Sequence, residues 1–577
     1  METRLLKADL LIIGGGSAGC MAAIRALELK PDLKVVIFEK GDIKYSGSIA
    51  RGMDALNIVA IPDFTTPELY LEAVRISCQG IVDAAPSYIM ASRSYELLKK
   101  LEGWGVRFPL DKNGRYRTLR YHVKGEFQTA MEEPDLKVMI SRRAQEMGAV
   151  AVNRVMGLEL LMDEGRVAGA IGLQVRTGET VACSAGAVIL TAGGQARFSL
   201  PNSGYLYGVF DYPGNTGDGY IMAFDAGAGL TGMEYSNRSM LIKDANMPLL
   251  AITVTRGGRV MDIFENVLME GECHSLGRMN EAFNQGKGPL RIRLSHLSAE
   301  VIDEIEGILF STERPVQERF FKGRGIDFRK RDIELWPTES QLCGGHGMSG
   351  VYVDERAETG VPGLYAAGDA ACVPKQHLTG AFVFGEISAE SALGYLAATP
   401  PVRLNGDQVR AAEKKRDSRF QTAGREIDVR DLEYKTRRFI GDYVISPKNE
   451  YKLKRWLEWA RRFEEEIENG VRVSNGHELS KLYEVENIVR CANFSAEASL
   501  ARKESRWGDN HRRTDFPERD DKNFGCHVVL TRGGDAGEIE AGTRPVQDRI
   551  GPRKFEARNP KSETISSQNS NDQKASR

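Results

Sequence analysis

The glycine-rich turn near the start of the chain constrains the fold more than any other feature. Residues 8–19 read ADLLIIGGGSAG, an apolar run followed by three glycines in the spacing GxGxxG. Gly14 permits a tight turn, Gly16 lets the backbone approach a pyrophosphate, and Gly19 lets a helix pack closely on the preceding strand. The pattern predicts a dinucleotide-binding βαβ unit; a glycine-rich turn in another kind of α/β protein is the alternative.

The neighbouring residues complete the expected nucleotide site. A pyrophosphate is expected at the helix N-terminus, beside Ser17 and Ala18, where free N–H groups and the helix dipole favour an anion. A second apolar run ends in Glu39 and Lys40. Glu39 follows the last glycine of the turn by about 20 residues, the distance at which a carboxylate accepts hydrogen bonds from a ribose.

Composition narrows the choice of partners. The chain has 577 residues, of which 41% are hydrophobic and 27% charged, and its net charge is −2. This balance gives no electrostatic reason to expect nucleic acid or an anionic membrane surface as a partner. No apolar run approaches the ~20 residues that span a bilayer, so we expect no direct membrane insertion.

The start of the chain and its cysteines favour the cytoplasm. The first strand is expected within a few residues of the start, without a secretory segment. The eight cysteines are scattered, and none forms CxxC or another metal-ligand spacing. We therefore expect a cytoplasmic protein that carries no metal and no iron–sulfur cluster of its own.

Two later segments repeat the change from strand to glycine. Residues 187–191 and 363–367 are strand-like. Each leads into residues that suit a ligand-facing turn, and these are Ala192, Gly193, Gly194, Gly368 and Asp369. The nucleotide domain is therefore expected to be assembled from discontinuous segments.

Periodicity predicts the remaining organisation. Residues 66–104 have helical spacing and end at Gly103 and Gly105, and Gly165 marks a hairpin. After Gly534 the hydrophobic periodicity is lost, and the end of the chain is expected to be disordered.

Several separate motifs, in order, resemble the flavoprotein subunit family of succinate dehydrogenase, fumarate reductase, L-aspartate oxidase and adenylylsulfate reductase. They extend over about residues 5–525 and comprise GGGSAG with Glu39 and Lys40, SGSIARGM (46–53), LEGWGV (101–106), TGDG (216–219), GLYAAGD (363–369), SRWG (505–508) and DFPERD (515–520). Within this family the chain looks closer to the adenylylsulfate reductase α-subunit branch, which it resembles in IKYSG (43–47), Asn57, FFKGRGID (320–327) and CGGHG (343–347).

The resemblance implies an α/β fold with a Rossmann-like FAD-binding domain, an inserted α+β capping domain and a C-terminal helical domain. The expected boundaries are 1–235 and 337–400 for the FAD-binding domain, 236–336 for the cap, 405–510 for the helical domain and 511–577 for a C-terminal segment with a disordered tail. The residues expected to bind FAD are Gly14, Gly16, Ser17, Ala18, Gly19, Glu39, Lys40, Ser46, Gly47, Ser48, Arg51, Gly52, Ala192, Gly193, Gly194, Asp218, Gly368, Asp369, Glu386 and Ser388.

Three departures from the family pattern bear on chemistry. Membrane-complex members attach FAD through a histidine, and the matching position here is Gly47, so the resemblance implies a non-covalent FAD. Adenylylsulfate reductases carry an additional arginine in a cap segment that here reads NRSMLIKD (237–244), and its absence argues against a sulfonucleotide substrate. Gln341 stands where membrane-complex enzymes have a histidine, which weakens the succinate or fumarate interpretation.

Five residues are candidates for catalysis by resemblance. Arg278 matches the setting of the family's proton-donating arginine, with a surface ion pair as the alternative. His346 and His377 are candidates to donate a hydrogen bond or a proton to a substrate, with a structural role as the alternative. Asn57 and Glu126 match positions that lie close to the flavin in the adenylylsulfate reductase branch. The alternative for either residue is a capped turn or a solvent-exposed side chain.

We therefore predict an FAD-dependent oxidoreductase that passes electrons between a small anionic substrate and a separate ferredoxin-like iron–sulfur subunit. One alternative is a succinate/fumarate-type acid oxidoreductase that uses Arg278. The other is a flavin electron-transfer subunit with no substrate site of its own.

Overall fold

The structure is a computed structural model that describes residues 3–51, 55–201, 211–243, 250–271, 276–313, 315–420, 424–534 and 538–550. Within these ranges the side chains of 51, 251, 276, 311–313 and 315–317 are not described. Gly52, expected to bind FAD, lies outside the described residues, as does the end of the chain from 551.

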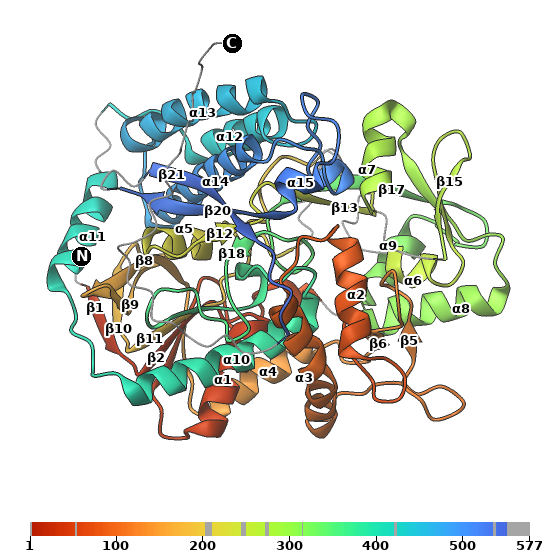
Figure 1. Cartoon of the computed structure of the whole chain (residues 1–577), viewed down its shortest axis with the longest axis horizontal. Coiled ribbons are helices and arrows are strands. Elements are labelled where there is room, and N and C mark those ends of the chain that lie inside the picture. The colour runs from red at the N-terminus through yellow and green to blue at the C-terminus, as the bar shows by residue number, and fades with distance from the viewer. Residues whose placement is uncertain are drawn as a thin grey trace, which may run out of the picture.

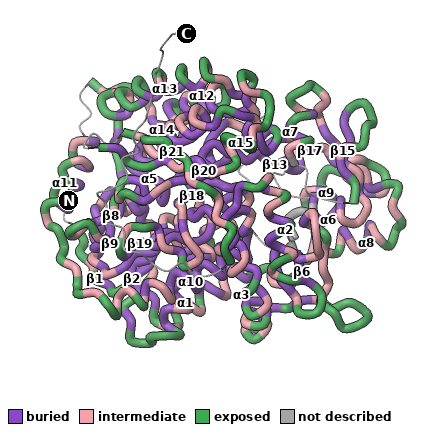
Figure 2. Tube along the Cα trace, in the orientation of Figure 1, coloured by how far each residue is buried: buried purple, intermediate pink, exposed green. Residues whose placement is uncertain are grey.

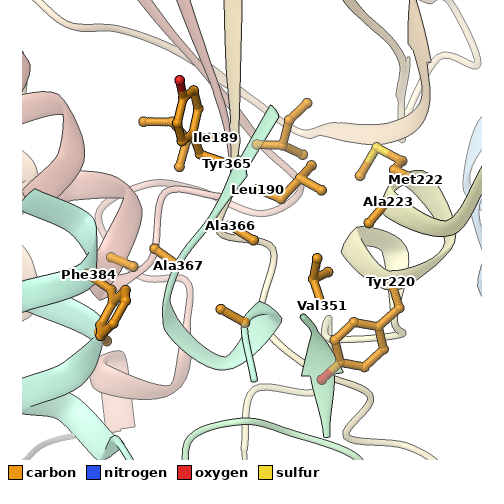
Figure 3. Close-up of a cluster of buried hydrophobic side chains, with 14 of the residues drawn as sticks. Ile189, Leu190, Tyr220, Met222, Ala223, Val351, Tyr365, Ala366, Ala367 and Phe384 are labelled. Carbon is orange, nitrogen blue, oxygen red and sulfur yellow. The ribbon is translucent and has the colours of Figure 1, made fainter. Parts of the chain in front are cut away.

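A parallel sheet forms the centre of the nucleotide-binding part (Figure 1). Its strand order is β19 (Leu364–Ala366), β11 (Ala187–Leu190), β2 (Leu10–Ile13), β3 (Val35–Glu39) and β7 (Val150–Asn153), and every neighbouring pair is parallel. The sequence runs of these strands are apolar because a parallel sheet is covered on both faces. Figure 3 shows the resulting core, with Ile189 and Leu190 beside Tyr365 and Ala366.

Two helices cover this sheet next to the glycine turn. Helix α1 (Ser17–Leu29) begins directly after the turn, and α10 (His377–Ala398) packs against it. The close approach depends on Gly385, where an added Cβ would lie 2.6 Å from the carbonyl oxygen of Ala18. The two segments expected to build one nucleotide domain, from opposite halves of the chain, therefore meet in one core.

A second sheet is formed by β1 (Arg4–Lys7), β10 (Thr180–Ser184), β9 (Arg166–Gln174) and β8 (Val155–Asp163). The hairpin expected at Gly165 is confirmed, because β8 and β9 pair antiparallel on either side of it.

The helix expected over 66–104 is two helices, so that prediction of one continuous element was wrong. Helix α2 (Pro67–Ser77) and α3 (Ala84–Gly103) are separated by Gln79 and Gly80, both with positive φ (49° and 88°). Positive φ ends a right-handed helix. A small sheet of β4 (Ala55–Leu56), β6 (Gln128–Ala130) and β5 (Thr118–Leu119) contains segments from either side of these helices, and α4 (Leu136–Glu146) follows it in the chain.

A separate antiparallel sheet forms the lobe at the right of Figure 1. Its order is β13 (Asn237–Ile242), β17 (Ile333–Gln341), β16 (Leu290–Arg293), β14 (Arg259–Met261) and β15 (Val267–Glu270). The helices of the lobe are α6 (Leu250–Val254), α7 (Leu276–Ala282), α8 (Ala299–Gly307) and α9 (Pro315–Gly323). This lobe has its own hydrophobic core, from Met240 to Leu335, within the range expected for the cap.

The later part of the chain is helical. It contains α11 (Gly406–Arg419), α12 (Val429–Tyr443), α13 (Glu450–Glu465) and α14 (Gly476–Ala501). Figure 2 shows exposed residues on outer helices such as α11 and α13, and buried ones concentrated in the interior. None of the described helices combines the length and apolarity needed to cross a bilayer.

The C-terminal segment is more ordered than its composition indicates. Strand β20 (Cys526–Gly533) pairs with β21 (Glu538–Pro545), so the loss of periodicity after Gly534 does not mark the end of regular structure. This sheet also contains β12 (Leu230–Thr231) and β18 (Gly350–Val351). The predicted fold class, a mixed α/β flavoprotein fold with a C-terminal helical part, is confirmed.

Candidate functional site

A cavity lies at the carboxyl ends of the parallel strands. Ile13, Glu39, Thr191 and Gly368, which end or follow four of these strands, all line it. Its empty volume is about 1000 Å³, including space open to solvent. Ligands of open α/β sheets bind in this place, at the edge where the strands end.

Three glycines form a cradle of bare backbone in this cavity. Gly14 has φ 102°, and an added Cβ there would lie 2.4 Å from the carbonyl oxygen of Thr191. A Cβ on Gly16 would meet nothing within 4 Å, so Gly16 faces open space. Gly47 has φ 81° and lies so close that its Cβ would be 3.1 Å from the Cα of Gly16. The absence of side chains leaves room for a ligand to touch the backbone.

Glu39 is held rigidly at one wall of the cavity. The residue is buried, and its two carboxylate oxygens accept hydrogen bonds from the N–H groups of Gly15 (2.8 Å) and Gly41 (2.6 Å). A carboxylate has about four acceptor sites, so sites remain for ligand hydroxyls.

Lys40 belongs to a buried charge network that joins the cavity to the helical part. Its Nζ donates to Gly214 O (2.9 Å), Thr216 Oγ1 (2.9 Å) and Asp218 Oδ2 (3.0 Å), and lies 3.0 Å from Glu484 on α14. Burial acts to lower the pKa of Lys40, but Asp218 and Glu484 outweigh it and raise that pKa.

Glu484 is shared among three cations, namely Lys40, Arg197 and Lys481. Although burial opposes ionisation, Arg197 and Lys40 lower the pKa of its carboxyl well below the usual range. The ionic partners of Lys40 are thus supplied by two distant segments of the chain, α5 (Asp218–Asp225) and α14.

The structure places thirteen of the residues expected to bind FAD in the cavity wall, namely Gly14, Gly16, Ser17, Ala18, Glu39, Lys40, Gly47, Ser48, Ala192, Gly193, Asp218, Gly368 and Asp369. Gly19 lies behind the wall, where a Cβ would be 1.9 Å from Gly14 O, so it serves helix packing as expected. The side chain of Arg51 is not described.

Four other expected residues do not line the cavity. Glu386 forms ion pairs with Lys100 (2.6 Å) and Arg93 (3.5 Å) on α3. The hydroxyl of Ser388 donates to its own helix at Gly385 O. Ser46 is buried outside the wall, and a Cβ on Gly194 would collide with Leu342 O at 2.4 Å. These four residues therefore stabilise the fold around the cavity and do not form its wall.

Two predicted catalytic histidines meet at the other end of the same cavity. His346 and His377 both line it, with ring centroids 4.9 Å apart. His122, for which no sequence motif gives a signal, completes the group at 6.4 Å from the ring of His377. Its Nε2 lies 3.0 Å from the carbonyl oxygen of Asn57, which also lines the cavity. We refer to His122, His346 and His377 as the histidine cluster.

Burial keeps the histidine cluster neutral at pH 7. It lowers the pKa of His122 to about 4 and that of His377 well below the usual value, and the other two histidines add to the effect on His377. Burial also lowers the pKa of His346, and Asp211 opposes the shift. A neutral imidazole offers one donor and one acceptor.

The backbone at this end of the cavity is unusual. Lys375 and His377 have φ values of 61° and 48°, in the left-handed region that side chains seldom adopt. Two buried polar atoms of residues that line the cavity, His377 Nδ1 and Asn57 Oδ1, have no hydrogen-bond partner among the described residues. Strain and unmet hydrogen bonds concentrate where a ligand binds.

Lys375 supplies positive charge beside the histidine cluster. Its Nζ donates to the hydroxyl of Tyr235 (3.0 Å) and to His346 O (2.7 Å). The charge contributes to lowering the pKa of all three histidines. No sequence motif identified Lys375, because its partners lie in other segments.

Asp369 lies near Asp211, whose carboxylate is 3.9 Å from His346 Nε2. Burial, together with the nearby carboxylate of Asp211, raises the pKa of Asp369 to about 8, while the N–H of Gly345 has the opposite effect. Both carboxyls line the cavity. Asp369 is therefore mostly protonated at neutral pH.

The structure does not bring Arg278 or Glu126 into the cavity wall. Arg278 is exposed on α7. Glu126 accepts a hydrogen bond from Thr118 Oγ1 (2.7 Å). No group of three or more histidine, cysteine or acidic side chains in the described ranges is arranged to hold a metal ion.

A parallel sheet with a glycine cradle, a carboxylate at the end of the second strand and a long cavity defines a dinucleotide-binding protein. Comparison with known proteins specifies the class. Residues 9–379 match the FAD binding domain family model, and residues 435–559 match the fumarate reductase flavoprotein C-terminal model.

Relatives match along nearly the whole chain. The fumarate reductase flavoprotein subunit of Mycobacterium tuberculosis is 26% identical over 93% of this chain and 97% of its own length. The 8-methylmenaquinol:fumarate reductase flavoprotein subunit of Wolinella succinogenes is 24% identical over 95% of this chain and 92% of its own. The solved adenylylsulfate reductase of Archaeoglobus fulgidus has the same fold, with a TM-score of 0.85 at 23% identity over 96% of this chain and 97% of that one.

This chain belongs to the fumarate reductase/succinate dehydrogenase flavoprotein family, and it is an FAD-dependent oxidoreductase. The predictions of family, enzyme class and cofactor are confirmed. The cavity independently fits FAD, since the bare-backbone cradle and the fixed carboxylate are what a dinucleotide requires.

Proposed function

We propose that this chain transfers electrons between a small anionic substrate and a separate ferredoxin-like iron–sulfur protein. The observation that carries the proposal is the continuity of one cavity, because Gly16 of the cradle and His377 of the histidine cluster line the same space. A cofactor held at one end is thereby placed beside a substrate at the other.

In this proposal the chain's residues divide into two tasks. The glycine cradle holds the pyrophosphate, Glu39 binds ribose hydroxyls, and Gly47, without a side chain, leaves the cofactor non-covalent. The bound FAD supplies a flavin ring that accepts or donates an electron pair. His346 and His377 donate hydrogen bonds to the substrate or move a proton to it.

An anionic substrate is supported by the electrostatics of the histidine cluster. The charge of Lys375 disfavours further positive charge on the imidazoles, so an anion would meet a favourable field. A neutral imidazole keeps one N–H group that can donate a hydrogen bond to an anion. Asn57, with its unpartnered Oδ1, offers an amide to the same ligand.

The iron–sulfur partner is supported by the relatives, which are subunits by name. The cytoplasm is the proposed location, supported by the free thiols of the seven described cysteines, as is usual in a reducing compartment.

The test is a titration of the FAD-loaded protein with small carboxylate and oxyanion ligands, followed by flavin absorbance. We expect at least one anion to perturb the spectrum, and His377→Gln to weaken that binding at least tenfold. His477→Gln, at an exposed position on α14, is the matched control and should have no effect.

Two outcomes would favour the alternatives. If no anion perturbs the flavin while a reduced ferredoxin still transfers electrons to it, the chain is an electron-transfer subunit. Turnover of fumarate or succinate that Arg278→Ala abolishes would establish the acid oxidoreductase, although the exposed position of Arg278 gives no support for it.

A further inference from the structure

A buried lysine lies directly behind the glycine turn. Lys137, the second residue of α4, is 3% exposed, and its Nζ donates to Gly15 O (2.5 Å) and to Cys20 Sγ (3.5 Å). Among the described residues Lys137 forms no ion pair, and the Glu39 carboxylate binds the N–H of Gly15 rather than the lysine. Lys40, by contrast, has two carboxylates at 3.0 Å.

An ammonium group in this position is costly for the protein alone. A buried charge without a counter-charge has lost its hydration and gained little in return. One carbonyl oxygen and one thiol are weak compensation for three N–H donors. The charge therefore has no contacting counter-charge among the described residues.

The contact to Gly15 orients the backbone of the cradle. In a trans peptide the C=O and N–H groups point in opposite directions, so the N–H of Gly16 points away from Lys137. Gly16 lines the cavity, whereas Gly15 and Lys137 do not. No described residue accepts a hydrogen bond from this N–H. Lys137 thus lies behind the peptide, with the unpaired N–H on the opposite side.

We propose that Lys137 is a positioning residue for the FAD pyrophosphate, and that the two negative charges of this group are its missing counter-charge. The lysine fixes the Gly15–Gly16 peptide with its N–H available to a phosphate oxygen, and its own positive charge attracts the anion through that peptide. In a chain whose Gly47 cannot tether the flavin, this attraction contributes to retaining it. The proposal concerns cofactor retention and does not depend on the substrate.

The test compares nucleotide ligands on apoprotein prepared without FAD. Lys137→Met removes the charge and keeps an unbranched side chain of similar length. We expect its dissociation constants for FAD and ADP, measured by calorimetry, to rise at least tenfold, and that for adenosine, which has no phosphate, to change less than twofold.

Lys137→Gln separates charge from hydrogen bonding, because it keeps an N–H donor for Gly15 O and lacks the charge. If the charge dominates, Lys137→Gln should raise the dissociation constant for ADP by about the same factor as Lys137→Met. Lys34→Met, at an exposed lysine of the same βαβ unit, is the matched control and should leave all three affinities unchanged.

The melting temperature of the apoprotein distinguishes this role from a structural one. Removal of an uncompensated buried charge should leave the apoprotein of Lys137→Met as stable as the parent or more stable, while its gain in melting temperature on adding FAD should shrink. Equal losses of ADP and adenosine affinity, or a less stable apoprotein, would show that Lys137 only supports the fold. Failure of both charge-free variants to fold in the presence of FAD would also overturn the proposal.

Discussion

The two ends of the cavity are built in opposite ways. At the glycine end, the backbone takes conformations suited to glycine, and the Glu39 carboxylate and the Lys40 ammonium both have protein partners. At the histidine end, a histidine has positive φ and two buried polar atoms lack partners among the described residues. The first arrangement, in which the protein fixes the side chains of Glu39 and Lys40, suits a cofactor that stays bound. The second, in which two buried side-chain atoms lack partners, suits a ligand that comes and goes.

The largest expected effect comes from filling the cradle. Gly16→Val places a side chain in space that is open in the protein, so the apoprotein should fold with an unchanged melting temperature and retain no detectable FAD after desalting. Gly394→Val, on α10 and also without close neighbours, should retain its flavin. Normal flavin content in Gly16→Val would show that the dinucleotide binds elsewhere.

Removing the shared carboxylate of the charge network should have the next largest effect, which is a loss of unfolding free energy. Glu484→Gln leaves Lys40 and Arg197 with less negative charge in a buried site, and a broken buried pair costs about 3–5 kcal/mol. The free energy of unfolding from denaturant titration measures it. Glu318→Gln breaks an exposed pair with Lys322 on the cap and should cost less than about 0.5 kcal/mol. Equal losses of unfolding free energy in the two variants would mean that the buried network stabilises the protein no more than an exposed ion pair does.

Lowering the pH should destabilise the protein through the buried His122 of the histidine cluster. The folded-state pKa of His122 is about 4, below the ordinary value of 6.5, so the unfolded state binds the proton first and stability is lost as the pH falls from 6.5 towards 4. The shift corresponds to about 3 kcal/mol. His122→Asn should have a flatter dependence of unfolding free energy on pH over this window. An unchanged slope would show that this imidazole is not buried in a neutral form.

Raising the pH should weaken FAD binding, and the change in free energy should be smaller than in the preceding predictions. Asp369 has a pKa of about 8 and is neutral below it, so its ionisation at higher pH adds a negative charge to a cavity that holds a pyrophosphate. We expect FAD affinity to fall about threefold to tenfold between pH 7 and 9, from a repulsion of about 1 kcal/mol. Asp369→Asn should bind FAD equally well at both pH values, as measured by flavin fluorescence.

The same contrast explains what could be predicted from the sequence. The glycine end is encoded in continuous residues, because a strand, a turn and a helix place Gly14, Gly16 and Glu39 together by local geometry. The histidine end is assembled from segments far apart in the chain. His122 lies in no motif, and only packing brings it to His377.

Distant packing also accounts for features that the sequence did not reveal. Glu386 was expected at the flavin, but two cations on α3 bind it, and no local pattern connects these helices. The break near Gly80 depends on backbone conformation that periodicity does not encode. The order beyond Gly534 comes from pairing with β20, which can organise a polar strand.

The charge network around Lys40 has a consequence for the order of events during synthesis. The glycine turn and Glu39 leave the ribosome early, but the second carboxylate of Lys40 is at position 484, on α14. A nascent chain that has reached only the first βαβ unit therefore lacks all the partners of Lys40 described above, from Gly214 to Glu484. The cavity wall also includes Gly368 and Asp369, so the complete wall and the complete charge network exist only after most of the polypeptide has been made.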